Sequence, residues 1–275
     1  MTGDHGGVAT RLEGRSGRSW GVSGALRVME GELVAYRRNW RASAFSTFLN
    51  PVLFLAAMGL GLGSLVDRGQ QLAELSYLAF YASGLLAAQG MMTAVGDASY
   101  PVMAGMKWIK SYHAALATPV APRDLVVGHA SFIMLRVTFA SVAFVTVAAV
   151  FGAFPWPRGM AAVSVAVLCG LAYATPVMAF TGALERETAL AGLFRFGLVP
   201  MFLLSGTFFP LDQLPGWLQS VARLVPLWHA IELVRGITVD VAPELPWVGH
   251  VAYLVTWLIA GSALSFRIFR RRLAP

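Results

Sequence analysis

The sequence predicts an all-α integral membrane protein with six transmembrane helices. Hydrophobic residues make up 57% of the 275 residues, charged residues only 13%, and the mean hydropathy is +0.64. Soluble domains average about 25% charged residues. The apolar residues also gather in runs of about 20, the length that crosses a hydrocarbon core ~30 Å thick. This composition leaves no room for a soluble catalytic domain.

Six apolar runs are the predicted spans: Ala44–Val66, Leu75–Val95, Leu125–Phe151, Met160–Leu184, Ala189–Phe209 and Trp247–Phe266. Residues 1–25, which are rich in Gly, Ser and Arg, are predicted to form a disordered cytoplasmic tail because they offer few apolar side chains to bury. The transmembrane domain is expected to cover residues 26–272.

An amphipathic helix is expected just before the first span. In "ALRVMEGELVAYRRNWRASAF" the apolar residues Leu26, Met29, Leu33 and Tyr36 recur at helical spacing. Such a helix lies in the membrane interface. It is either a plain anchor or an elbow that also touches a cytoplasmic partner. Its candidate polar contact residues are Glu30, Arg37 and Arg38.

The loop between the second and third spans, "GDASYPVMAGMKWIKSYHAALATPVAPRDLVVG", is expected to be cytoplasmic. Pro101 opens it and Pro119 closes it, so Val102–Ala117 is predicted to form a helix of about four turns. Exposed aromatic side chains on such a helix favour a partner surface, and the alternative is a helix that rests in lipid headgroups. The candidate docking residues are Met106, Lys107, Trp108, Lys110, Tyr112 and His113.

An outer helical hairpin is expected between the fifth and sixth spans. In "SGTFFPLDQLPGWLQS" and the residues that follow, Leu211, Leu214, Leu218, Val221 and Val225 form an apolar stripe. A second short helix, "PLWHAIELVRG", is predicted to stop at Gly236. Helices of about ten residues are re-entrant or interfacial, so this hairpin is expected to cap the outer mouth of a pathway.

The candidate gate residues of the hairpin are Phe208, Phe209, Pro210, Trp217, His229, Glu232 and Arg235. Glu232 and Arg235 are predicted to face each other, because they lie three residues apart on one helix. Three further polar residues are candidates for lining the pathway, with helix–helix contacts as the alternative: Asn50, Tyr81 and Gln89. Arg136, inside the third run, either snorkels to the cytoplasmic interface or lines the pathway.

The basic residues predict the orientation. The net charge is +7, with 19 Arg and 2 Lys. With six spans, 16 of these cations fall on the side that holds both termini and 4 on the other side. The positive-inside rule therefore predicts a multi-pass protein of the cytoplasmic (inner or plasma) membrane with both termini cytoplasmic. The charge is expected to set topology and contact membrane lipid, not nucleic acid.

Motifs for catalysis are missing from the sequence. There is no H-E-x-x-H for zinc and no G-x-x-x-x-G-K-[ST] for nucleotide, and the five histidines are scattered. Cys169 is the only cysteine, so no intrachain disulfide can form. No catalytic site, metal site or cofactor is expected in this chain, and the chain is not expected to be an enzyme by itself.

Four segments carry a family resemblance: "SYPVMAGMKW", "AALATPVAPRDLVVG", "SGTFFPLDQLP" and "VPLWHAIELVRG". With the predicted elbow, loop helix and hairpin, they resemble type-2 ABC exporter permeases, the membrane subunits of ATP-driven transporters. Within that family the chain looks most similar to nodulation lipo-oligosaccharide exporter permeases, and more distantly to daunorubicin-resistance permeases.

The resemblance implies a permease subunit for an amphiphilic glycolipid, a lipid-linked saccharide or an oligosaccharide-type cargo. The alternative it leaves open is drug or antibiotic efflux on the same architecture. It also implies two copies of a separate ATPase subunit, which bind ATP and Mg, and a second permease copy or close paralogue. The predicted helix Val102–Ala117 matches the coupling helix that docks on the ATPase. A membrane-embedded lipid enzyme and a secondary transporter are the alternatives from other classes.

Overall fold

The computed structural model describes residues 21–38, 40–63 and 76–273, and within these ranges the chain is helical and contains no strand. Most of the predicted disordered tail, residues 1–20, lies outside the described residues. The prediction was wrong for residues 21–25, which already belong to the first helix, α2 (Gly21–Tyr36).

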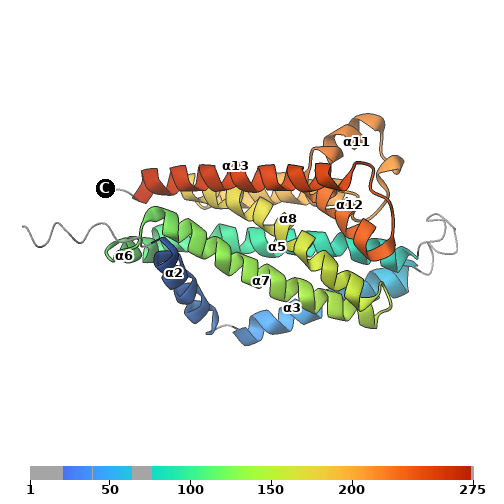
Figure 1. The fold of residues 1–275 in the computed structure, drawn as a ribbon, viewed down its shortest axis with the longest axis horizontal. Coiled ribbons are helices and arrows are strands. Elements are labelled where there is room, and N and C mark those ends of the chain that lie inside the picture. Colours follow the sequence, from blue (N-terminus) through green and yellow to red (C-terminus); the bar gives the residue numbers. More distant parts are fainter. Residues whose placement is uncertain (1–20, 39, 64–75, 274–275) are drawn as a thin grey trace, which may run out of the picture.

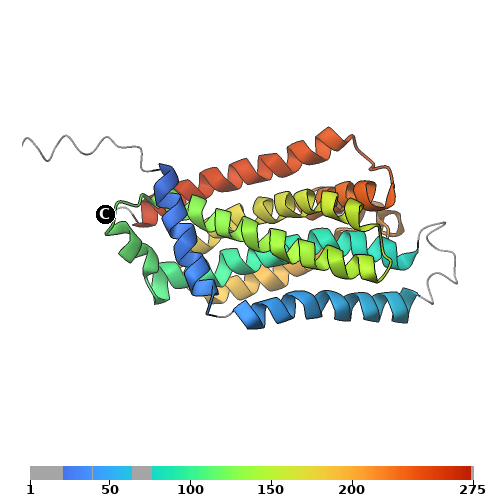
Figure 2. The same ribbon diagram turned by 60° about the horizontal axis from the view of Figure 1, so that its bottom comes forward.

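Four helices are long and apolar enough to cross a membrane, and they run side by side along the long axis of the molecule (Figures 1 and 2). They are α5 (Tyr77–Met103), which continues through the π-helical turn η3 (Ala104–Trp108), α7 (Pro122–Val150), α8 (Trp156–Ala183) and α13 (Trp247–Leu273).

Two shorter apolar segments flank these four helices. The first is α3 (Trp40–Leu55), which continues as the π-helical η1 (Ala56–Gly63) along one edge of the bundle (Figure 2). The second is built from three pieces, α9 (Thr188–Gly192), the π-helical η4 (Leu193–Leu198) and α10 (Val199–Leu204). Within the described residues a helical segment lies at each of the six predicted apolar runs, and four of these segments are long enough to be candidate spans.

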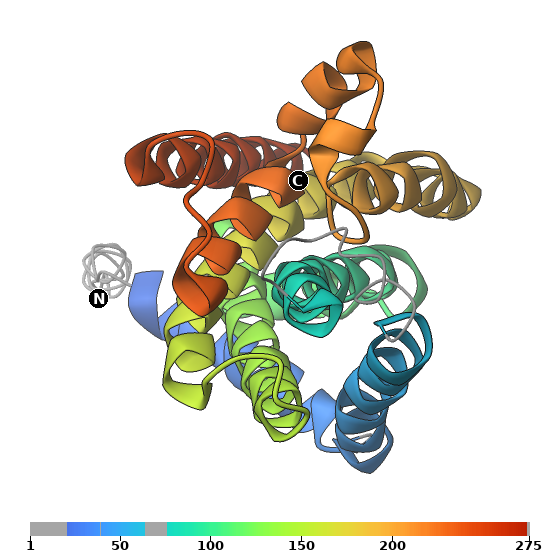
Figure 3. The ribbon, with the colours of Figure 1, turned by 90° about the vertical axis from the view of Figure 1, so that its right-hand side faces the viewer.

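The two ends of the bundle differ in structure. At one end, which we call the α6 end, α2 crosses over α7, and the short helix α6 (Ser111–Leu116) lies near the C-terminus of α13 (Figures 1 and 2). At the other end, the α11 end, η5 (Leu211–Gln213) and α11 (Gly216–Arg223) project from the bundle, while α12 (Pro226–Val239) packs against α5, α8 and α13 (Figure 3).

The core forms around α5, whose residues are mostly buried, and small residues bring its neighbours close. A side chain at Gly90 would place its Cβ 2.5 Å from the carbonyl oxygen of Ala166 on α8. Only a glycine permits this approach, and such small-residue contacts are the usual way in which membrane helices pack. On the far side of α8, Ser265 of α13 donates a hydrogen bond to the carbonyl of Thr175 over 2.6 Å.

The second span is longer than predicted. Instead of ending near Val95, it runs through Pro101 without a break and continues to Trp108. The predicted single helix Val102–Ala117 is therefore wrong. Its first half extends the span, and its second half is the separate helix α6, because Lys110 adopts a left-handed conformation with φ 56° that interrupts the helix.

The outer hairpin exists, but its two arms are unequal. In the second arm, Leu227, Ile231 and Val234 form an apolar stripe that is fully buried. That helix does not stop at Gly236, however, and extends to Val239. The first arm is only eight residues long and leaves Trp217 70% exposed. The hairpin therefore consists of one helix that belongs to the bundle and one that lies on its surface.

Candidate coupling site

Two large apolar side chains are exposed at the α6 end, where η3 ends. Trp108 is 53% exposed and Ile109 is 75% exposed, and Lys110 follows in the left-handed conformation. We call Trp108–Lys110 the apex. Large apolar side chains rarely stand together on a surface without a partner. Of the predicted docking residues, Trp108, Lys110 and His113 are exposed, and Ile109 is an exposed residue that the sequence analysis did not include.

Tyr112 does not belong to this surface. It was expected to share an exposed face with Trp108, but its side chain is only 3% exposed and points back into the bundle. A Cβ at Gly105 would lie 2.8 Å from the Tyr112 ring, so this glycine makes the space for it. The ring packs against Phe269 of α13 at 5.9 Å. Burial raises the pKa of the Tyr112 hydroxyl well above its usual range.

Next to Tyr112 lies His129 of α7, which is fully buried. The sequence pattern did not indicate a role for this histidine. Its Nε2 lies 3.0 Å from the backbone carbonyl oxygen of Asp97. In an α-helix that carbonyl would accept from the N–H of the residue four positions later, which here is Pro101 and has no N–H. His129 therefore satisfies an acceptor that Pro101 leaves free, which explains how α5 continues past a proline.

The other ring nitrogen of His129 connects the bundle to α2. Nδ1 lies 3.0 Å from the carboxylate oxygen of Glu32, and the Tyr112 hydroxyl lies 3.4 Å from the same nitrogen. A carbonyl and a carboxylate can only accept, so both ring nitrogens must donate for both bonds to form. The geometry therefore favours a charged imidazolium paired with Glu32.

Arg136 and Asp97 form the next layer of this network. Arg136 Nε donates to Asp97 Oδ2 over 3.1 Å, and its guanidinium lies 4.5 Å from the ring centre of Tyr36. Arg136 therefore does not simply snorkel. It is held between α5 and α2 by an ion pair and a cation–π contact.

The face of α2 that meets the protein differs from the predicted one. Ala25 is buried and Gly128 of α7 leaves room for Ala25 and Val28, so the contact face runs along Ala25, Val28, Glu32 and Tyr36. The predicted polar residues Glu30, Arg37 and Arg38 are all exposed. Glu32 was missed because an acidic residue on a packing face is unusual unless a buried partner neutralises it.

Two contacts join the residues just before the apex to the end of α8 and the loop after it. Lys107 donates to the backbone carbonyl of Glu185, and Met106 packs against Gly182. From α13, Arg272 donates to the carbonyl of Ala183 over 2.7 Å. Met106 and Lys107 therefore hold the apex in place, and they are not part of its free surface.

A small polar cavity of about 280 Å³ lies between α3, α5 and α7. It brings together two of the three candidate pathway residues, Asn50 and Gln89, beside the Asp97–Arg136 ion pair. Tyr81 lies elsewhere. It is fully buried near the α11 end, where its ring is 5.7 Å from Phe208, one of the candidate gate residues.

Glu232 and Arg235 do not form a direct ion pair in the described structure, and each makes its hydrogen bond elsewhere. Arg235 is buried, donates to the carbonyl of Gly206 over 2.6 Å and lies 3.7 Å from the ring centre of Phe80. Glu232 accepts from the backbone N–H of Glu244 over 3.0 Å. Each charge thus binds a different loop. Arg235 fastens α12 to the turn after α10, and Glu232 fastens it to the segment before α13.

Other gate residues form two groups. His229 Nδ1 lies 2.9 Å from His250 Nδ1, and the His229 ring stacks on Tyr253 at 4.0 Å. Phe208 packs against Phe202 at 5.0 Å, while Phe209 and Pro210 are half-buried in the loop that leads to α11. Trp217 stands apart from both groups on the exposed α11.

Four long apolar helices run side by side, and two charged pairs, Glu32–His129 and Asp97–Arg136, lie between helices at one end. These features define a polytopic α-helical membrane protein. Comparison with known proteins makes the assignment specific. The profile of the ABC-2 type transporter family matches residues 26–239, and the chain belongs to that family.

The nodulation relatives match almost the whole chain. Nodulation protein J of Rhizobium meliloti (strain 1021) is 31% identical over 251 residues, which are 88% of this chain and 94% of that protein. Nodulation protein J of Rhizobium leguminosarum bv. viciae is 30% identical over 267 residues, 97% of this chain and 99% of that protein. A probable multidrug ABC transporter permease, YbhR of Escherichia coli (strain K12), is 31% identical over 88 residues, 32% of this chain and 23% of that protein.

Proposed function

We propose that this chain is the permease subunit of an ATP-driven exporter that moves an amphiphilic glycolipid, lipid-linked saccharide or oligosaccharide-type cargo across the cytoplasmic membrane. Membership of the ABC-2 family and the similarity to nodulation proteins along nearly the whole chain support this proposal. The sequence carries no nucleotide-binding P-loop motif. In this proposal the energy comes from ATP and Mg bound by two copies of a separate ATPase chain, and a second permease copy or close paralogue completes the channel.

One observation carries the mechanism: α5 and η3 form a continuous rod from the apex to the outer hairpin. The rod runs from Tyr77 to Trp108, 32 residues, or about 48 Å at 1.5 Å per residue. At the α11 end the Tyr77 hydroxyl donates to the carbonyl of Phe208 over 3.4 Å, and Phe80 holds Arg235 of α12. A push on the apex therefore reaches the hairpin through one element.

The network around His129 makes the apex part of a larger moving unit. Through Tyr112, His129 and Glu32, the helices α6, α7 and α2 are joined to the carbonyl of Asp97 on the same rod. A docked ATPase at the apex would then displace α2 and α5 together. In this arrangement the α6 end faces the cytoplasm, both termini are cytoplasmic, and all six apolar segments span the membrane.

Drug efflux is the second candidate function. The similarity to a probable multidrug permease over 88 residues favours it, although that match covers only 23% of the relative. The two candidates share the coupling mechanism and differ in cargo. Lipid and saccharide that co-purify with the complex, identified by mass spectrometry, would distinguish them.

The coupling step is tested by removing the apex side chains. The variant Trp108→Ala, Ile109→Ala should insert normally, but it should lose co-purification of the ATPase or uncouple ATP hydrolysis from export. Removing a buried aromatic anchor costs about 2 kcal/mol or more, roughly thirtyfold in affinity.

A matched control is Val150→Ala, Trp156→Ala, which removes two exposed apolar side chains at the α11 end. This control should retain the ATPase. If the apex variant retains wild-type ATPase binding and wild-type export in vesicles, the apex rests on lipid and the proposed coupling is wrong.

A further inference from the structure

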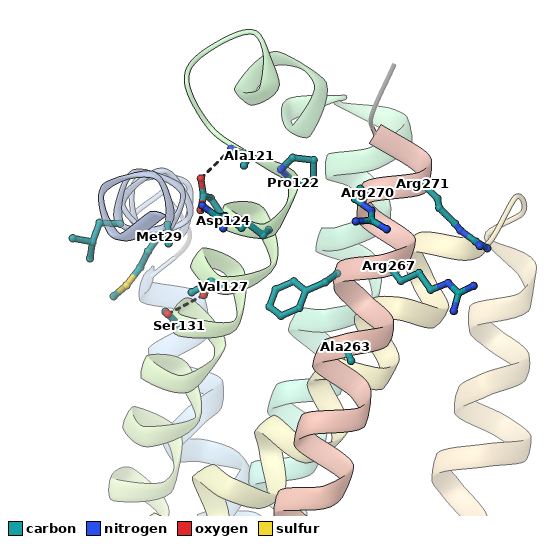
Figure 4. Close-up of a pocket in the computed structure, with 14 residues that line it drawn as sticks. Met29, Ala121, Pro122, Asp124, Val127, Ser131, Ala263, Arg267, Arg270 and Arg271 are labelled. Carbon is teal, nitrogen blue, oxygen red and sulfur yellow. Dashed lines mark hydrogen bonds and ion pairs between the residues drawn. The ribbon is translucent and has the colours of Figure 1, made fainter. Parts of the chain in front are cut away.

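A groove with a volume of about 1070 Å³ opens at the α6 end between α2, the first turns of α7 and the last turns of α13 (Figure 4). Small-molecule pockets usually hold about 300–1,000 Å³, so the groove is large enough for an amphiphile. It is separate from the apex and from the polar cavity at Asn50 and Gln89.

The residues of α13 that line the groove change from apolar to basic toward the end of the helix. Ala263, Phe266, Arg267, Arg270 and Arg271 all line the groove, and at 3.6 residues per turn they cover an arc of about 140° on α13, from Phe266 to Arg271. The first two are apolar and the last three are basic. The facing wall adds Leu26, Met29 and Val127, which are also apolar. From residue 263 to residue 271 the helix rises about 12 Å, which takes the groove from an apolar floor to a basic rim.

The rim has an excess of positive charge that the described residues do not neutralise. Arg267, Arg270 and Arg271 are exposed, and none of the three makes an ion pair within the described part of the chain. Arg123 also lines the groove, but its Nε lies 3.9 Å from Asp124 Oδ1, so this arginine is paired. The one acid of the groove, Asp124, is buried and accepts a hydrogen bond from the N–H of Ala121 over 2.9 Å.

We propose that this groove binds one anionic phospholipid of the membrane leaflet at the α6 end. The acyl chain would lie against Phe266, Met29 and Val127, and the phosphate would lie among the arginines of the rim. A phospholipid has apolar acyl chains at one end and an anionic headgroup at the other, which matches the apolar floor and the basic rim along the helix axis. A protein partner would not require this arrangement. Arginine is also suited to bidentate hydrogen bonds with phosphate.

This lipid would have a structural consequence for the proposed coupling. The groove is the place where α2 and α13 face each other across the start of α7. A lipid that fills it would bridge the two helices and fix the position of α2, and therefore of Glu32. The inference rests on the proposed function only for this consequence, since binding itself can be measured on the purified chain without ATPase or nucleotide.

The test measures binding of a fluorescent phosphatidylglycerol to the purified chain in detergent, with phosphatidylcholine of the same acyl chains as the neutral reference. We expect the chain to prefer phosphatidylglycerol. The variant Arg267→Gln, Arg270→Gln should weaken this binding about twenty-five-fold, since each arginine near an anionic headgroup contributes a factor of roughly five. Arg267→Lys, Arg270→Lys should restore most of it.

The matched control is Arg186→Gln, Arg195→Gln, which removes two exposed charges outside the groove near the same end. It should bind lipid like the wild type. Ala263→Trp should fill the apolar floor, and it should lower binding of the long-chain lipid without changing the charge. Ala263 is exposed, so the larger ring does not disturb the core.

Three results would overturn the proposal. Equal affinity for the two lipids would show that the rim does not recognise the anionic headgroup. Equal losses in the groove variant and the control would show that only overall charge matters. A change of oligomeric state in the groove variants, with unchanged lipid binding, would assign the groove to a second copy of the chain.

Discussion

The central prediction concerns His129, which joins three helices at the α6 end. Replacing it by leucine removes the partner of Glu32 and leaves the carbonyl of Asp97 without a donor. Breaking a buried ion pair costs about 3–5 kcal/mol, and an unsatisfied buried acceptor costs about 1–3 kcal/mol. The Glu32 side chain is 23% exposed and can recruit water. We therefore expect His129→Leu to lower the free energy of unfolding by about 2–4 kcal/mol.

The double variant His129→Leu, Glu32→Leu should lose less free energy of unfolding than the two single variants lose when their losses are added. Replacing both members of a buried pair by apolar residues is often neutral, because no uncompensated charge remains. We expect a coupling free energy of about 1.5–2 kcal/mol. The measurement is equilibrium unfolding in mild detergent for the wild type, both single variants and the double variant. A coupling below about 0.5 kcal/mol would show that the two side chains do not interact.

Pro101 provides the second half of this test. Pro101→Ala restores an N–H that can bond to the carbonyl of Asp97, so His129 no longer has to satisfy that acceptor. In this background His129→Leu should cost about 1 kcal/mol less than in the wild type. The same cost in both backgrounds would show that His129 does not compensate for the N–H that Pro101 lacks.

Three further predictions concern other parts of the chain. In a Cys169→Ser background, an external thiol reagent should label Gln219→Cys but neither Lys107→Cys nor Arg271→Cys in intact cells, and the reverse pattern would invert the topology. Arg235→Ala should lower the free energy of unfolding by about 2–3 kcal/mol, because a charged hydrogen bond to Gly206 is lost. Arg158→Ala, at an exposed ion pair with Asp240, should cost less than about 1 kcal/mol in the same equilibrium unfolding measurement. Gly90→Val should prevent close packing of α5 on α8 and abolish a folded monomer in size-exclusion chromatography, and a normal elution profile would contradict this.

The sequence by itself determined the class of protein and the order of its parts. A chain with so few charges and apolar runs this long has no soluble fold available, and each run appears as a helical segment. The outer hairpin followed from runs too short to span and from the prolines between them. The elbow before the first span followed from its helical periodicity. Each of these features depends on residues close together in the chain.

The faces of the helices were decided only by the tertiary structure. In a membrane, apolar side chains cover both the lipid-facing and the protein-facing sides, so hydrophobic periodicity does not show where a partner lies. Most of α5 is buried and little of α13 is, although both satisfy the same criterion for a span. For this reason the sequence gave no indication of His129. Tyr112 was placed on the surface because the sequence does not show the left-handed Lys110, which separates α6 from the helix before it.

The pairing of the charges was decided in the same way. Glu232 and Arg235 are neighbours on one helix, yet each has a partner from another loop, because the turn at Gly206 and the N–H of Glu244 lie closer to them in the fold. The carbonyl of Asp97 is free because Pro101 follows it by four residues, which the sequence does show. That a histidine 32 residues away supplies the missing donor depends on the packing of α5 against α7, and only the folded chain contains that information.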